Sequence, residues 1–87
     1  MIYTIDQQSA RIIDNFVANL EGKTREIAAA YLRIPNTPDC QPEVLALMAS
    51  HGKDFRIISD AVEQLRRELD VSYDVLQPEL QRRLYLS

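Results

Sequence analysis

The side chains best suited to chemistry in this chain are one cysteine and one histidine, Cys40 and His51. A cysteine nucleophile needs a neighbouring base and a third group that orients that base. No such third group is evident from the sequence, and His51 suits the negative end of a helix. Cys40 is therefore better interpreted as an ordinary loop thiol, and we expect no Cys/His active site.

Metal and phosphate sites are also not indicated. Zinc prefers more soft ligands than this chain offers, and its possible ligands have no recognised metal-binding spacing. A phosphate-binding loop needs clustered glycines, whereas Gly22 and Gly52 are isolated and stand where helices end. We expect no cofactor and no metal. The metal ligands considered are Asp39, Cys40, Glu43 and His51.

Carboxylate pairs could in principle carry out acid–base catalysis. General acids are usually partly buried, because burial adjusts their pKa. Asp60 and Glu63 instead fall opposite an apolar seam, where a solvated helix face is the better interpretation. The sequence therefore predicts a protein that is not an enzyme.

The element that organises the chain is a helix expected near residues 54–69. Its apolar residues recur at alternating spacings of three and four, which only a helix places on one face. Ile57 and Ala61 widen the apolar arc, so we predict contacts with several neighbours and a central position. Two pairs of opposite charge, Glu63 with Arg67 and Arg56 with Asp60, are spaced for ion pairs on the solvent-exposed side of the helix. The seam consists of Phe55, Ile58, Val62, Leu65 and Leu69.

The remaining segments predict further helices. A first helix is expected to begin near Thr4, with Asp6 as the rival cap, and to end at Gly22. Its stripe is Ile12, Ile13, Phe16, Val17 and Leu20, and residues 2–5 could instead form a short strand before it.

Prolines delimit the later helices. The second is expected to start at Thr24 and end before Pro35, with Ile27, Ala30, Tyr31 and Ile34 on one face. After a loop over residues 36–42, a third helix through Val44, Leu45, Leu47 and Met48 is expected to stop at Gly52. Because proline disrupts a helix interior, a break or a new start is expected at Pro78.

These elements predict an all-α fold, a compact bundle of about five short helices in a single domain over residues 1–87. The formal net charge is -3, without the basic excess typical of proteins that grip nucleic-acid backbones. One cysteine cannot form an internal disulfide, and no run has the length of a signal sequence or membrane span. We expect a cytoplasmic protein that does not enter the membrane.

One segment, residues 65–76, resembles the core of helix-turn-helix DNA readers. Leu69, Val71, Ser72 and Leu76 match that pattern. The chain departs from it at Arg66, where a small residue is usual, at Asp70, where glycine is usual, and at Pro78. If the resemblance holds, it implies DNA contacts by Arg66, Ser72 and Tyr73.

Two functions from different classes follow. The first is a small protein-interaction module, an adaptor, inhibitor or regulator that binds a larger protein and itself forms a homodimer. Large apolar residues are abundant for the length of the chain, and tyrosines and arginines are frequent anchors of interfaces. The alternative is the helix-turn-helix DNA-binding regulator. The predicted partner-binding residues are Tyr73, Tyr85, Arg82 and Arg83.

Overall fold

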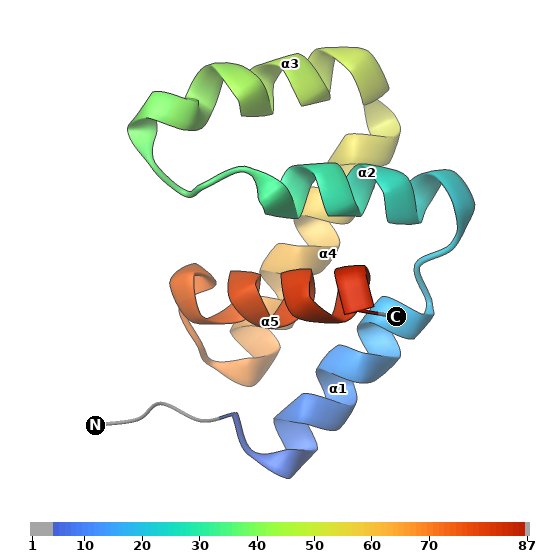
Figure 1. Ribbon diagram of the computed structural model, residues 1–87, viewed down its shortest axis with the longest axis vertical. Helices are drawn as coiled ribbons and strands as arrows, with labels where there is room; N and C mark the ends of the chain where they lie inside the picture. The colour runs from blue at the N-terminus through green and yellow to red at the C-terminus, as the bar shows by residue number, and fades with distance from the viewer. Residues whose placement is uncertain (1–4, 87) are drawn as a thin grey trace.

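The computed structural model describes residues 5–86, and in this range it contains five α-helices, one short 3-10 helix and no strand. The all-α bundle predicted from the sequence is confirmed (Figure 1). The predicted start at Thr4 and most of the possible strand over residues 2–5 lie outside the described residues. The helices are α1 (Gln7–Ala18), α2 (Gly22–Arg33), η1 (Pro38–Cys40), α3 (Gln41–His51), α4 (Lys53–Leu69) and α5 (Tyr73–Leu86).

The first two helices differ in how they begin. Asp6 caps α1, because its carboxylate accepts a hydrogen bond of 2.7 Å from the backbone N–H of Ser9. α2 begins at Gly22 rather than at Thr24, so the prediction of Thr24 as its cap was wrong. Gly22 adopts a positive φ of 55° and turns the chain into the helix at this residue. The first helical hydrogen bond therefore runs from the N–H of Arg25 to the carbonyl of Glu21.

The core is formed where α4, α2, α5 and α1 meet, and α4 supplies four of its side chains, more than any other helix. The seam predicted for α4 is therefore confirmed for its first four residues, whereas Leu69 is half-buried. The predicted widening of its arc holds only in part: Ala61 is half-buried, but Ile57 is 62% exposed, and within residues 5–86 no helix covers it. The buried core cluster is Ile13, Val17, Ile27, Ala28, Leu32, Phe55, Ile58, Val62, Leu65, Leu76, Leu80 and Leu84.

α2 packs against α3, α4 and α5, and its buried face differs slightly from the predicted one. Ile27 and Ile34 are buried as expected, but Ala30 is exposed and Leu32 is buried instead. The buried face is therefore rotated relative to the predicted stripe. Pro35 ends the helix as predicted, and a 3-10 turn within the expected loop leads into α3.

α5 runs without a break through Pro78, which contradicts the predicted break at this residue. Its buried residues lie on both sides of the proline, so packing holds the two halves in one line. Gln77, next to the proline, donates from Nε2 to the carbonyls of Leu32 and Ile34, at 2.8 Å each. Pro78 has no N–H to donate to the carbonyl of Asp74, four residues earlier. Both residues are exposed, so water can hydrogen-bond this carbonyl instead.

A three-residue turn connects α4 to α5. Asp70 adopts the left-handed conformation, with φ 55° and ψ 49°, and the N–H of Val71 bonds back to the carbonyl of Arg66. This is the hydrogen-bond pattern that commonly closes a helix, usually with glycine at the left-handed position. Aspartate tolerates that conformation better than most residues do.

Candidate interaction surfaces

The two chemically distinctive side chains, Cys40 and His51, lie just before the start and at the end of α3. Eleven residues of helix place them roughly 16 Å apart. Cys40 is half-buried, and its sulfur accepts a hydrogen bond of 3.4 Å from the hydroxyl of Thr37. Among residues 5–86, no three His, Cys, Asp or Glu side chains gather in a way that could hold a metal ion.

Tyr73, a predicted partner-binding residue, packs against other aromatic side chains. Its ring lies 6.5 Å from that of Tyr31, which in turn meets Phe55 edge-on at 5.1 Å between ring centres. Burial, reinforced by the charge and the hydrogen bond of Tyr31, raises the pKa of Tyr73 well above its ordinary value of 10.0. Tyr73 therefore joins α5 to α2, and its hydroxyl stays neutral at physiological pH.

Arg83, another predicted anchor, holds α5 against α1. Its side chain is only 15% exposed and pairs with Asp14 of α1 and with Glu79, the latter at 2.6 Å. Through these ion pairs Arg83 has a structural role within the chain. Arg82 is more open, since its side chain is 55% exposed and pairs only with Glu79 among the described residues. The hydrogen bonds from Arg83 and Arg82 lower the pKa of Glu79.

Tyr85, like Arg82, is a predicted anchor of the C-terminal helix that is open to solvent. It is 52% exposed, and its hydroxyl donates to the carbonyl of Ala29 in α2 at 3.2 Å. The guanidinium of Arg33 stacks over its ring, 5.6 Å from the ring centre. Arg33, Arg82 and Tyr85 are therefore exposed side chains of α2 and α5, and we call them the Tyr85 surface.

The residues predicted to contact DNA are largely engaged within the chain or flanked by acidic groups. Arg66 donates to both carboxylate oxygens of Glu63, at 3.1 and 2.6 Å, and to the carbonyl of Val71 at 3.4 Å. The hydrogen bond from Arg66 lowers the pKa of Glu63. Ser72 is exposed in the turn, and Tyr73 is half-buried. The ion pair predicted between Glu63 and Arg67 is present at 3.2 Å.

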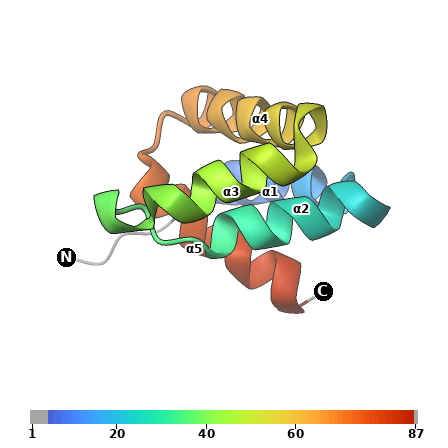
Figure 2. The ribbon, with the colours of Figure 1, turned by 90° about the horizontal axis from the view of Figure 1, so that it is seen from above.

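A surface that sequence reasoning missed lies on α3. None of its eleven residues is buried, although its sequence, QPEVLALMASH, carries only one acidic residue and no lysine or arginine. Val44 and Leu47 are half-buried against the core, whereas Leu45 is 59% exposed and Met48 is 43% exposed. Figure 1 shows α3 at the top edge of the molecule, and Figure 2 shows it beside α2 and α4.

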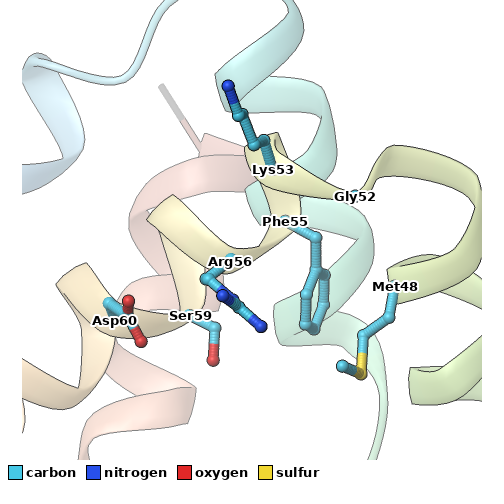
Figure 3. A pocket seen from close by; sticks show the side chains of 7 residues that line it. All are labelled: Met48, Gly52, Lys53, Phe55, Arg56, Ser59 and Asp60. Atoms are coloured by element: carbon cyan, nitrogen blue, oxygen red, sulfur yellow. The ribbon is translucent and has the colours of Figure 1, made fainter.

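A groove of about 460 Å³ opens beside this helix, between α3 and α4. Figure 3 shows Met48, Phe55 and Arg56 pointing toward the same space, with Lys53 directed away from them. The ion pair expected between Arg56 and Asp60 is absent from the described residues, so the guanidinium of Arg56 is available to another group. We call the exposed α3 side chains and this groove the α3 surface. Its residues are Leu45, Met48, Lys53, Phe55, Arg56, Ser59 and Asp60.

The signal for this surface was present in the sequence. An apolar helix with so few charges is usually buried on most sides, and four large apolar residues fall within five positions, 44–48. What periodicity cannot tell is how many neighbours such a helix finds. In this fold α3 packs against α2 and α4 only through one side.

No helix among the described residues has both the length and the apolar character needed to cross a membrane. Comparison with protein-family models, with curated proteins and with solved structures finds no match to this chain.

Proposed function

We propose that this protein is a non-enzymatic interaction module that acts by binding other protein surfaces. The observation that carries this proposal is α3, an apolar helix without a single buried residue. Contiguous exposed apolar groups beside a groove are typical of protein-binding sites. Scattered surface leucines need no such explanation, but Leu45 lies one helical turn from Met48, and Met48 lines the groove.

The free energy available from covering this surface is substantial for a small protein. Burying a leucine or methionine side chain completely is worth about 1.5–3 kcal/mol. With roughly half of each side chain exposed, covering Leu45 and Met48 together would contribute about 2 kcal/mol before the groove is counted. This free energy is released only when a partner covers the two side chains.

The Tyr85 surface supports a second contact, with the larger protein. Tyrosine and arginine are enriched among residues that dominate binding energy, and Tyr85 is already fixed by Ala29 and Arg33, so little freedom is lost on binding. Of the four predicted anchors, Tyr85 and Arg82 are the two with side chains open to a partner. Tyr73 and Arg83 remain predictions as partner contacts.

Site-specific photo-crosslinking tests the proposed function. A benzoylphenylalanine is placed at position 45, at position 85, or at position 68 as an exposed control on α4, and the protein is irradiated in cells of its natural source. We expect discrete adducts from position 45 or 85 that are absent at position 68. Equal, diffuse labelling from all three positions would refute the proposal.

The helix-turn-helix alternative ranks second. One observation favours it: Asp70 is left-handed at the turn position where such motifs usually carry glycine. The acidic groups around the turn, and the engagement of Arg66 by Glu63, oppose phosphate binding. Retardation of mixed-sequence duplex DNA at low salt, abolished by Arg66→Glu and by high salt, would reverse this ranking.

A further inference from the structure

The α3 surface carries both a protrusion and a groove that could receive it. Leu45 is the more exposed of the two exposed large apolar residues of α3, and Met48, one helical turn later, lines the groove with Phe55 (Figure 3). Because the protruding side chain and the groove lie on the same face, a second copy of this face can fill the groove and cover the protrusion at once. When the two copies are related by a two-fold axis, the leucine of each copy enters the groove of the other.

The charges near α3 also differ between its two ends. Asp39 and Glu43 are exposed at its amino end and form no ion pair within residues 5–86. The groove at its carboxyl end has one basic side chain directed into it, Arg56, and a second, Lys53, at its rim, against one acidic side chain, Asp60. An antiparallel pairing of two α3 helices brings the acidic end of one toward the basic rim of the other, and it also opposes their helix dipoles.

From this geometry we propose that the occupant of the α3 surface is a second copy of this chain. The two α3 helices pack antiparallel across a two-fold axis, Leu45 of each copy enters the Met48–Phe55 groove of its partner, and Arg56 faces the acidic amino end of the partner's helix. This inference rests on the proposed function, since it names the partner of one of its surfaces. The Tyr85 surface is left free for the larger protein.

Sedimentation equilibrium from low-micromolar to millimolar concentration tests the pairing in the full chain. We expect a reversible monomer–dimer equilibrium whose dissociation constant rises with salt. Leu45→Glu should raise that constant at least about tenfold, because it places a charge in an apolar groove. Met48→Lys should do the same from the other side of the contact.

Matched controls identify the surface. Ile57→Glu introduces the same side chain at an equally exposed apolar position on the other flank of α4, and it should leave the dimer intact. Arg56→Glu should weaken the dimer, whereas Arg67→Glu, the same charge change at an exposed position farther along α4, should not. Circular dichroism of each variant checks that the helices are retained.

Three results would overturn the inference. The first is a wild-type chain that stays monomeric at millimolar concentration, and the second is a dimer that Leu45→Glu and Met48→Lys leave unchanged. The third is a dimer that Ile57→Glu disrupts as strongly as they do. A monomer that still gives discrete crosslinks from position 45 to a different protein refutes only the second-copy pairing. A monomer without discrete crosslinks refutes the proposed function as well.

Discussion

Replacing Gln77 by leucine is the sharpest test of how this fold is held together. Gln77 is 9% exposed and donates two hydrogen bonds of 2.8 Å, to the carbonyls of Leu32 and Ile34 at the carboxyl end of α2. The last carbonyls of a helix have no N–H partner within the helix, and here the Gln77 side chain of α5 supplies the missing donors. Leucine has a similar size and keeps the packing while it removes both donors.

The expected magnitude follows from these contacts. A hydrogen bond contributes about 1 kcal/mol, and a buried group left unpaired costs about 1–3 kcal/mol. The carbonyl of Leu32 keeps a donor from Gln81, whereas the carbonyl of Ile34 loses the donor that Gln77 supplies. We therefore expect Gln77→Leu to lower the free energy of unfolding by about 2 kcal/mol, or the melting temperature by roughly 8–16 °C.

Urea denaturation followed by circular dichroism measures this change. Gln81→Leu should cost less, because Gln77 still donates to Leu32, and the double variant should cost more than the sum of the two. Exposed Gln64, replaced by leucine, serves as the control and should change stability by less than about 0.5 kcal/mol. A Gln77→Leu protein as stable as the control would show that water or a shifted backbone serves these carbonyls equally well.

Three further predictions address the helix ends and the aromatic cluster. Asp6→Ala should lower the melting temperature and Asp6→Asn should largely retain it, as thermal unfolding will measure, because asparagine can still accept from the N–H of Ser9. Asp70→Gly should preserve or raise stability in urea, whereas Asp70→Val should cost roughly 1–2 kcal/mol at the left-handed turn. The raised pKa of Tyr73 means that its contribution to stability is fully present below pH 10.0 and is lost as pH rises through the folded-state pKa; Tyr73→Phe should reduce this alkaline loss in pH-dependent unfolding.

The helices of the core could be predicted because their apolar residues repeat with the period of a helix. Ile13 and Val17 in α1, and the first four residues of the seam of α4, are buried where periodicity placed them. The misjudged residues stand at the margins of those stripes. Ala30 and Ile57 each lie beside a buried face, and whether a marginal residue is covered depends on the angle at which the next helix packs.

Pro78 shows a different limit of sequence reasoning. The rule that proline breaks a helix concerns local hydrogen bonding and sterics, and it is sound for an isolated segment. In α5, Leu76 and Leu80 are fully buried on either side of the proline, and Gln77 and Gln81 bind the end of α2. These contacts involve residues more than forty positions away, which a local rule does not contain.

The candidate site was harder to predict than the fold because residue type does not reveal which groups are already occupied. Arg83 and Tyr73 have the chemistry of interface anchors, yet within the chain they are held by Asp14, Glu79 and Tyr31. Tyr85 and Arg82, chosen by the same reasoning, remain open to solvent. Only the packing distinguishes the two pairs.

α3 and α5 together show why burial must be known before function is argued. α5 contains a proline and several charged residues but buries three leucines and a glutamine, because it crosses both α1 and α2. α3 is richer in apolar residues and buries none, because it lies at the edge of the bundle. The composition of α3 suits a protein core, but its position leaves its apolar side chains exposed in a single chain. The α3 helix of a second copy, with Leu45 in the Met48–Phe55 groove, would cover these side chains.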